Sequence, residues 1–550
     1  MIIIRTNASS SSGIGHLARC RRLGASLNDQ GLKVFFVLDY INKYLNDYLE
    51  GFSFTGLYSF NESFQNEEDD ALRLLGSFNN KDVMAVIVDD YRLSNIWERS
   101  IAQLGCKVIV LDDQDKSNHE CHLLIDSTWE GEKTFKRYEN KVLNNTLRLL
   151  GPKYLLIDEA FGFVKKPNHK SFKKNKQLNI LLSLGGGGDL TFLISLICHL
   201  IDQLPDNLPY EISTIVGPYA LNKVDLIAFS KKHDNVRLIL DQDGLYDEIS
   251  SADLYIGASG GTLFESLAMN IPCLTFSISE NQKNDNENFE DLGHFFHLNK
   301  IDESDFKNFA ILVYQILSQY SRFNKYYENH TPFKIDGKGV FRVSNAIQSI
   351  ITEKILKIDP VHIKNELNFE GGYDLSEIDD FSVNRYLTAR NLKINLDKMI
   401  DTSPISQLDH YIWWLKDNKR TSYVLRKNGK VLLYIWHQLK KVDNEDVIIS
   451  GWFIANESCS ALDAMHAVTE HSIIIDKLFS SVNWIVVMRN DNYFMQKVHQ
   501  RLKFRKVDKR SSMEKVIQNS FPNTSNDDFL YYFCRIKNTS LTKNLKPKTH

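Results

Sequence analysis

The chain has 550 residues, of which 43% are hydrophobic and 25% are charged, a composition typical of a globular protein with several domains. Its net charge of −3 argues against a nucleic-acid-binding protein that works through bulk positive charge. Its seven cysteines form no disulfide framework and no apolar run is long enough to span a membrane, so we expect a cytoplasmic protein.

Short apolar runs alternate with segments of helix length over the first 350 residues. Because these runs are not interrupted by polar residues, they predict parallel sheets that are covered by helices on both faces. A helix is expected over Leu17–Leu27, where apolar residues recur on one face. The apolar runs are 1–5, 33–40, 83–91, 106–113 and 122–127 in a first lobe, and 178–190, 210–217, 235–240, 252–262 and 272–279 in a second.

Changes in composition predict the domain boundaries. Two α/β lobes are expected over 1–162 and 178–356, an arrangement that suggests a nucleotide-sugar enzyme with its site in the cleft between them. Residues 163–177 contain six lysines; such a run can bind an anionic partner, but a solvated linker is the favoured interpretation. The remaining expected segments are a second linker over 357–372, a domain over 373–540 and a tail over 541–550.

The last domain changes in character, with helices and strands that predict a mixed α+β sheet. Its clearest feature is a hairpin of Ser422–Lys427 and Lys430–Trp436. The two strands are joined by Asn428 and Gly429, a pair that favours a tight type I′ turn.

The loop Gly13-Ile14-Gly15-His16 between the first strand and its helix is the most informative stretch. Glycines allow close approach of a ligand, and free N–H groups at a helix start favour negative charge. The same helix start disfavours an imidazolium, so His16 is expected to stay neutral and to accept a proton. The alternative is a histidine that packs or caps at a helix start.

The first 350 residues resemble the UDP-sugar hydrolases of pseudaminic acid biosynthesis, which are GT-B relatives of the MurG-type glycosyltransferases. The resemblance rests on several short motifs that occur in the expected order. These are RTNASSSSGIGHLARC (Arg5–Cys20), IVDDY (Ile87–Tyr91), VLDD (Val110–Asp113), GPKYLLIDEAF (Gly151–Phe161), LSLGGGGD (Leu182–Asp189), ASGGTLFESLAMNIP (Ala258–Pro272), ENQ (Glu280–Gln282) and IDGKGVFR (Ile335–Arg342).

The resemblance implies that water removes UDP from UDP-2,4-diacetamido-2,4,6-trideoxy-β-L-altropyranose. His16 would be the base that activates the water for inverting attack at the anomeric carbon, without a metal. Tyr91 would be a second catalytic-site residue in contact with the sugar; the alternative is a tyrosine that merely ends a strand. The chief rival activity is that of an inverting GT-B glycosyltransferase, which passes the sugar to an alcohol.

The resemblance also implies a set of substrate-binding residues. Glu265 would accept the ribose hydroxyls, whereas Gly261 and Thr262 would offer N–H groups to the diphosphate. Asn281 would contact the sugar; the alternative is a loop-capping amide. Gly185 and Gly186 would let the backbone approach the nucleotide; the alternative is a tight strand-to-helix turn. Asn7 and the long run Gly185–Gly188 depart from the family pattern and leave the sugar open. The expected set is Arg5, Gly15, Gly185, Gly186, Gly261, Thr262, Glu265, Asn281 and Gln282.

Two other possibilities are set aside. His119-Glu120-Cys121-His122 is rich in potential metal ligands, but its spacing fits no zinc signature, and we interpret it as structural. No P-loop motif is present, which argues against a P-loop kinase.

Residues from about 373 onward resemble GNAT acyltransferases, which implies acetyl-CoA as a co-substrate. The similar segments are Tyr386–Asn391, Ile405–Trp414, Ser422–Trp436, Val447–Ile454, Trp484–Asn490 and Asn492–Phe504. The glycine pair of the family's pyrophosphate loop is missing before the helix expected from Ala461. Ser460 and Ala461 could still allow close approach of the cofactor at the helix start, and the alternative is a decayed cofactor site in a domain that only binds or scaffolds. Asn492 is the other expected cofactor contact; the alternative is a plain helix N-cap.

Together the two resemblances imply two Rossmann-like GT-B lobes followed by a GNAT-like α+β domain. They also imply a bifunctional enzyme of nonulosonic acid biosynthesis, because N-acetylation of a UDP-4-amino sugar precedes UDP removal in that pathway. The expected partner is a UDP-linked amino sugar, not a nucleic acid, and association with other enzymes of the pathway is expected.

Overall fold

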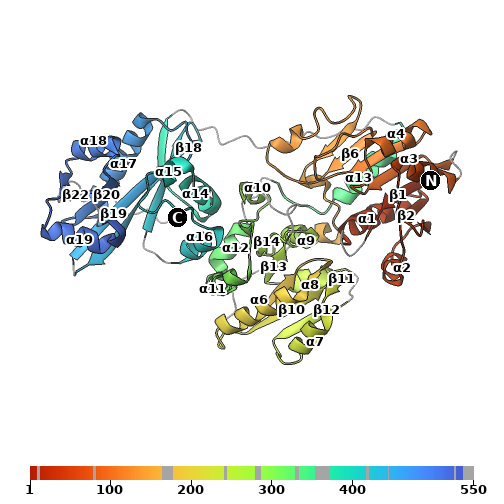
Figure 1. The fold of residues 1–550 in the computed structure, drawn as a ribbon, viewed down its shortest axis with the longest axis horizontal. Coiled ribbons are helices and arrows are strands. Elements are labelled where there is room, and N and C mark those ends of the chain that lie inside the picture. The colour runs from red at the N-terminus through yellow and green to blue at the C-terminus, as the bar shows by residue number, and fades with distance from the viewer. Residues whose placement is uncertain are drawn as a thin grey trace. The chain divides into compact units, whose positions relative to one another are not determined.

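The structure is a computed structural model that divides into two compact units, unit 1 (1–363) and unit 2 (364–550) (Figure 1). The structure describes residues 1–8, 13–78, 82–163, 177–217, 219–240, 244–278, 286–328, 333–353, 372–416, 420–443, 445–524 and 528–536. Residues 164–176 of the basic linker, 357–371 of the second linker and the tail 541–550 lie outside these ranges.

The first lobe of unit 1 is built on a seven-stranded parallel sheet with the order β3-β2-β1-β4-β5-β6-β7. This is the order of a Rossmann-like fold, extended by one strand. The strands are β1 (Ile2–Thr6), β2 (Val34–Leu38), β3 (Gly56–Ser59), β4 (Ala85–Asp89), β5 (Lys107–Leu111), β6 (Leu123–Asp126) and β7 (Leu147–Leu150).

The second lobe repeats this design with a six-stranded parallel sheet, β12-β10-β8-β13-β14-β15. Counted within the lobe, its strand order is again 3-2-1-4-5-6, so the prediction of two Rossmann-like lobes is confirmed. The strands are β8 (Leu178–Ser183), β10 (Tyr210–Val216), β12 (Val236–Leu240), β13 (Leu254–Ala258), β14 (Cys273–Phe276) and β15 (Phe296–Leu298), beside a small pair, β9 (Gly187–Asp189) and β11 (Tyr219–Leu221).

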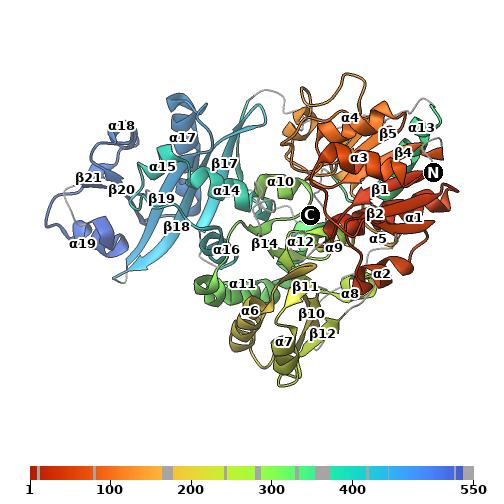
Figure 2. The same ribbon diagram turned by 45° about the vertical axis from the view of Figure 1, so that its right-hand side comes forward.

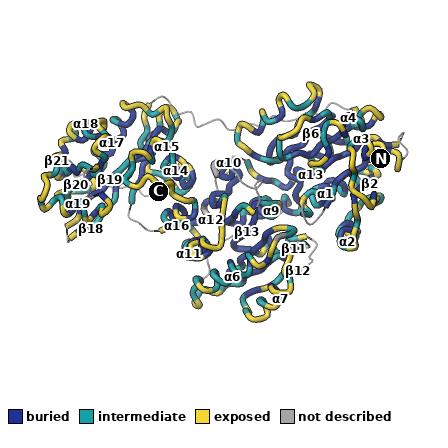
Figure 3. The backbone as a smooth tube through the Cα atoms, in the orientation of Figure 1, coloured by how far each residue is buried: buried dark blue, intermediate teal, exposed yellow. Residues whose placement is uncertain are grey.

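Burial explains why the apolar runs do not alternate with polar residues. Every residue of β1, β4, β6 and β13 is buried, since helices cover both faces of each sheet (Figure 3). The larger helices of unit 1 are α1 (Gly15–Asp29), α2 (Lys43–Glu50), α3 (Glu67–Gly76), α4 (Asn95–Gln103), α6 (Leu190–Gln203), α7 (Lys223–Ser230), α9 (Gly261–Ala268), α11 (Phe306–Ser318), α12 (Tyr320–Glu328) and α13 (Gly339–Ile351). Short helices are α5 (Ala160–Phe163), α8 (Tyr246–Ser251) and α10 (Asn286–Asp291).

Helix α13 returns from the second lobe to the first. It lies beside the first sheet, away from α11 and α12 that precede it in the chain (Figure 2). Val340, Val343 and Ile347 pack in the same core as Ile2 and Ile4 of β1. The helix therefore ties the end of the second lobe to the core of the first.

Unit 2 contains a mixed seven-stranded sheet with the order β16-β17-β18-β19-β20-β22-β21. Its pairs are antiparallel except β19 with β20, so the expected α+β domain is present. Asn428 and Gly429 have φ angles of 52° and 80°, which confirms the tight hairpin turn. The strands are β16 (Tyr373–Glu377), β17 (Arg420–Lys427), β18 (Lys430–Val442), β19 (Glu445–Ile454), β20 (Asn483–Arg489), β21 (Arg505–Lys506) and β22 (Phe529–Arg535).

The described residues of unit 2 form six α-helices. They are α14 (Val383–Arg390), α15 (Lys393–Leu396), α16 (Gln407–Leu415), α17 (Ala461–Leu478), α18 (Tyr493–Arg501) and α19 (Ser512–Ser520). Among the helices of the described residues, none combines the length and the apolar character that a membrane crossing requires.

A buried ion cluster explains the ligand-rich segment around His119. The two ring nitrogens of His119 lie 2.7 Å from Glu98 Oε1 and 3.3 Å from Asp112 Oδ2. Burial lowers the pKa of His119, but hydrogen bonds to Asp112 and Glu98 outweigh burial and raise that pKa to about 9. These contacts describe a cation held between two buried carboxylates, in agreement with a structural role.

The raised pKa of His119 makes the stability of the first lobe depend on pH. Its contribution is complete below the ordinary pKa of 6.5 and is lost as the pH rises through about 9. We expect the wild type to lose on the order of 3 kcal/mol between pH 6.5 and 10, and His119→Gln to lose much less. Urea unfolding at both pH values measures this. His122→Gln is the control and should keep the wild-type pH dependence.

Candidate active site

His16 lies in the first turn of α1 and is held by a carboxylate from the neighbouring strand. Its Nδ1 atom is 2.6 Å from Oδ1 of Asp89, the last residue of β4. Parallel strands β1 and β4 pair Thr6 with Asp89, which brings the end of β4 to the loop that leads into α1. The side chain of His16 is 17% exposed, whereas that of Asp89 is fully buried.

Asp89 stays ionised because Arg19 and His16 contact its carboxylate. Arg19 binds both of its oxygens at 2.6 Å, one turn along α1 from His16. Burial raises the pKa of Asp89, but the charge of Arg19 and the contact with His16 outweigh burial and hold that pKa well below its usual range. A permanent carboxylate therefore orients the histidine.

This contact decides which nitrogen of His16 can accept a proton. A carboxylate accepts hydrogen bonds, so the neutral ring that fits this contact carries its hydrogen on Nδ1, and Nε2 is the nitrogen that can accept a proton. Within the described residues Nε2 of His16 has no hydrogen-bond partner. The arrangement is that of a general base oriented by a buried acid.

Tyr91 completes this cluster from the loop after β4. Its ring stands edge-on to the ring of His16, with centroids 4.6 Å apart, and its hydroxyl donates to Asp113. Arg19 also binds Asp113 at 2.9 Å. Burial and the charge of Asp113 raise the pKa of Tyr91, so its hydroxyl stays protonated.

Sequence reasoning singled out His16 and Tyr91 but missed Arg19, Asp89 and Asp113. The signal was present, because both acids stand at the carboxyl ends of neighbouring parallel strands, where sites of α/β sheets gather. The position of Arg19, three residues after His16, places both side chains on one face of α1.

In the second lobe, α9 offers an open helix start. Its N-cap is Gly260, which makes no side-chain cap, and a Cβ atom at Gly260 or Gly261 would meet nothing within 4 Å. The first N–H groups of a helix have no partner within it, so those of Gly261 and Thr262, without a side-chain cap, could bind an anion. Helix α6 differs, since the carboxylate of Asp189 caps it by accepting from Thr191 N.

The glycine loops of the two lobes meet. Gly185 has a φ of +89°, a left-handed conformation that favours glycine. A Cβ atom on Gly186 would lie 2.7 Å from the Ile14 side chain of the first lobe. Gly15 is exposed at the start of α1, so the expected glycines border one junction between the lobes.

Glu265 lies one turn along α9 from Gly261 and forms an ion pair with the first lobe. Its Oε1 atom is 2.7 Å from Nη2 of Arg22 on α1, and its side chain is 5% exposed. Burial raises the pKa of Glu265, although the charge of Arg22 opposes this. The carboxylate expected to accept ribose hydroxyls thus has a cationic partner in this structure.

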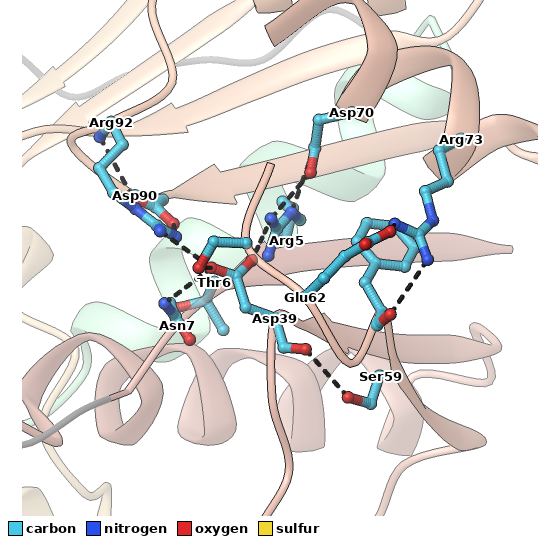
Figure 4. Close-up of polar contacts among 12 residues, drawn as sticks. Arg5, Thr6, Asn7, Asp39, Ser59, Glu62, Asp70, Arg73, Asp90 and Arg92 are labelled. Atoms are coloured by element: carbon cyan, nitrogen blue, oxygen red, sulfur yellow. Dashed lines mark hydrogen bonds and ion pairs between the residues drawn. The ribbon is translucent and has the colours of Figure 1, made fainter. Parts of the chain in front are cut away.

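Arg5 requires a correction. It was expected to bind substrate, but its side chain is 0% exposed and lies 2.5 Å from Asp39 and 2.9 Å from Asp70 (Figure 4). Arg92 joins the same cluster by binding Asp39 at 2.9 Å. The fully buried guanidinium thus ties β1 to the end of β2 and to α3.

Asn7, the departure from the family motif, lies at the edge of this cluster. Its amide donates to Oδ2 of Asp39 at 3.3 Å (Figure 4). The expected sugar contacts Asn281 and Gln282 lie outside the described residues.

Unit 2 contains a cavity of about 630 Å³. Strands β19 and β20 pair only over Val447–Ile449 and Asn483–Ile485, and their later residues line the cavity. Asn492 lies in the wall, and its side chain also caps α18 by accepting from Met495 N. Ser460 and Ala461 lie at the start of α17, outside the residues that line the cavity.

The start of α17 is closed by a capping box. Ser460 accepts from the backbone of Asp463, and the carboxylate of Asp463 accepts from the backbone of Ser460. Burial raises the pKa of Asp463, but hydrogen bonds from Ser460 and Tyr373 outweigh burial and hold that pKa well below its usual range. A negative charge therefore occupies the place where a pyrophosphate was expected.

No family profile matches the chain. An uncharacterized protein of Methanocaldococcus jannaschii is 24% identical over 440 residues, which cover 78% of this chain and 81% of that protein. Because the match is longer than the 363 residues of unit 1, it includes part of unit 2.

Two further relatives match shorter stretches. The spore coat polysaccharide biosynthesis protein SpsG of Bacillus subtilis is 26% identical over 214 residues, which cover 39% of this chain and 62% of that protein. The UDP-2,4-diacetamido-2,4,6-trideoxy-beta-L-altropyranose hydrolase of Campylobacter jejuni is 22% identical over 269 residues, covering 49% of this chain and 88% of that enzyme.

Solved structures with some likeness include S. aureus MnaA with UDP and Acinetobacter baumannii MurG. The first has a TM-score of 0.45 and 13% identity, and covers 65% of this chain and 99% of that chain. The second has a TM-score of 0.41 and 14% identity, and covers 63% of this chain and 99% of that chain.

The ion pair between Arg22 and Glu265 can be tested by stability. Arg22→Met leaves a buried carboxylate without its partner, so we expect unit 1 to lose about 2–4 kcal/mol. Calorimetric melting of the full chain measures the loss as a lower transition temperature. Arg99→Met, which removes an exposed pair with Glu120, is the control and should cost less than about 1 kcal/mol. Equal effects of the two substitutions would contradict the assignment.

Proposed function

We propose that unit 1 hydrolyses a UDP-linked amino sugar, with UDP-2,4-diacetamido-2,4,6-trideoxy-β-L-altropyranose as the leading candidate. The observation that carries this proposal is the His16–Asp89 contact of 2.6 Å at the start of α1. The similarity to the Campylobacter jejuni hydrolase, which covers 88% of that enzyme, supports the substrate class.

In the proposed reaction, Nε2 of His16 takes a proton from water while the water oxygen attacks the anomeric carbon. The new carbon–oxygen bond forms as the bond between that carbon and the phosphate oxygen breaks, and UDP leaves with the electron pair. Attack from the face opposite the leaving group inverts the anomeric configuration. Asp89 holds the imidazole during attack and stabilises the imidazolium that forms.

The second lobe supplies the proposed nucleotide contacts. The free N–H groups of Gly261 and Thr262 would receive the diphosphate, where the partial positive charge of α9 stabilises the developing negative charge. Glu265 would accept the ribose hydroxyls. Because Arg22 holds this carboxylate at 2.7 Å, binding requires that Arg22 share Glu265 or move toward the phosphates.

The rival proposal, an inverting glycosyltransferase, uses the same base but a different nucleophile. An alcohol rather than water would then lose its proton to His16. The two reactions differ in their sugar product, which is a free reducing sugar in hydrolysis and a glycoside in transfer. Release of UDP together with a free sugar, in the absence of any acceptor, therefore distinguishes them.

Substitutions of the base and its partner test the hydrolase proposal. We expect His16→Gln to slow UDP release from the diacetamido sugar by about 10²–10⁴-fold, the usual contribution of a general base. Asp89→Asn should slow release by about 10–10³-fold, because the amide neither fixes the tautomer nor stabilises an imidazolium. A coupled assay for UDP measures both rates.

Asp29→Asn, at the exposed far end of α1, is the matched control and should keep the wild-type rate. Wild-type activity in His16→Gln would exclude this histidine as the base. Absence of UDP release by the wild type would exclude the hydrolase itself.

We propose acyl transfer to the amino group of a UDP-4-amino sugar as a second candidate function, carried by unit 2. It is supported by the cavity that opens where β19 and β20 diverge, whose size suits a small-molecule ligand. Acetyl-CoA would supply the acyl group. The carboxylate of Asp463 does not fit a pyrophosphate at the start of α17, so a pyrophosphate contact there is not part of the proposal. The alternative is a non-catalytic binding domain.

Calorimetry with acetyl-CoA decides between these two roles of unit 2. If acetyl-CoA binds across α17, Asp463→Asn should bind it about three- to tenfold more tightly, because the substitution removes a repelling charge and keeps a capping group. Lys477→Met, at the other end of α17, is the control. No binding by the wild type or by Asp463→Asn would support the non-catalytic domain.

A further inference from the structure

One end of the unit 2 cavity combines cationic and aromatic side chains. Tyr386 and Arg390 lie four residues apart on α14, so both face the same way, and both line the cavity. Arg420, the first residue of β17, and Trp413 of α16 line the same end.

Arg420 is held rigidly by aromatic rings. Its guanidinium carbon lies 3.7 Å from the ring centroid of Trp436 and 5.0 Å from that of Trp413. Arg420 pairs with Gln438 across the hairpin, which makes it the diagonal neighbour of Trp436 on β18. Stacking of this kind fixes the plane of the guanidinium at this place in the cavity wall.

The guanidinium of Arg390 has few hydrogen-bond partners for a charged group in the wall of a cavity. Its Nη1 atom is buried without a hydrogen-bond partner, and Nη2 makes one long contact of 3.4 Å to the backbone oxygen of Asp401. Among the described residues no carboxylate forms an ion pair with Arg390. Burial lowers the pKa of Arg390; the charge of Asp401 opposes this effect, and the charge of Arg420 adds to it. The side chain of Asp401 instead accepts from Ser403 N.

A second unpartnered group lies beside it. Tyr386 is only 3% exposed, and its buried hydroxyl has no hydrogen-bond partner among the described residues. An unpaired buried donor costs free energy, so two of them in the wall of one cavity point to a partner inside that cavity. Both groups donate to oxygen, and the positive charge of the guanidinium favours an anionic oxygen.

We propose that this end of the cavity binds the anionic group of a small organic oxyanion, a phosphate or a carboxylate, through Arg390 and Arg420, with Tyr386 as a further donor. The rest of the ligand lies along the aromatic and apolar wall, in a cavity of about 630 Å³. This proposal does not depend on acyl transfer by unit 2. If unit 2 does transfer an acyl group, the arginine end of the cavity selects an acceptor that carries a negative charge.

Fluorine NMR of the full chain labelled with 5-fluorotryptophan tests the site without interference from nucleotide binding in unit 1. The chain has seven tryptophans, and Trp413→Phe and Trp436→Phe identify the two signals beside Arg420. The probes are inorganic pyrophosphate, UDP and glucuronate, with glucose as the neutral counterpart. Pyrophosphate and UDP report a phosphate ligand, and glucuronate reports a carboxylate.

We expect at least one oxyanion, and not glucose, to shift the signals of Trp413 and Trp436. Arg390→Met should weaken the response by about tenfold or more, and Arg390→Lys by less, because it keeps the charge but loses the planar fork. Lys398→Met removes a charge from the same cavity wall, where Lys398 pairs with Asp491 at 3.4 Å, and should leave the response unchanged.

Three results would overturn the proposal. They are no shift of either signal with any oxyanion, a wild-type response in Arg390→Met, or equal weakening by Lys398→Met. An unchanged Trp484 signal reports that unit 2 of a variant is folded. If Arg390→Met does not fold, the comparison of Arg390→Lys with Lys398→Met decides.

Discussion

The buried carboxylate of Asp89 is the interaction on which the candidate site of unit 1 depends. It is fully enclosed at the end of β4, where an isolated charge would be costly, and it persists because Arg19 binds both of its oxygens at 2.6 Å. Asp89 in turn contacts Nδ1 of His16, which leaves Nε2 as the proton acceptor in the proposed reaction. Arg19 extends the same network to Asp113, which binds Tyr91. A single ion pair thus connects the two residues proposed for the catalytic site.

Three helix starts of this chain fall into two kinds. Helix α9 begins at glycines without a side-chain cap, which leaves N–H groups for a diphosphate. Helices α6 and α17 begin instead with a carboxylate that accepts a hydrogen bond from the backbone of the helix start. This carboxylate belongs to Asp189 in α6 and to Asp463 in α17. A helix start that already holds a carboxylate repels a second anion. Anion binding in unit 2 is therefore better supported at the arginines of the cavity than at the helix where the sequence placed it.

Much of the fold could be predicted because it follows from local patterns. Buried parallel strands such as β4 and β13 read as uninterrupted apolar runs, and Asn428–Gly429 has the backbone freedom that a tight hairpin turn needs. Short strands such as β3, β7 and β15 were missed, since three or four residues leave too weak a pattern to separate from a loop. Arg5 was assigned to substrate although it is buried, because a sequence does not show whether an arginine at a strand end faces solvent or two carboxylates.

By itself the sequence determined the class of the fold, the place of His16 at a helix start and the glycines around it, all of which depend on neighbours along the chain. Only the tertiary structure decided what each charged group meets. Asp89 lies 73 residues from His16, and Glu265 lies 243 residues from Arg22. These pairs form because sheet order and the packing of the lobes bring distant segments together. The protonation and the role of a buried group depend on the charges a few ångströms away from it, whatever their separation along the chain.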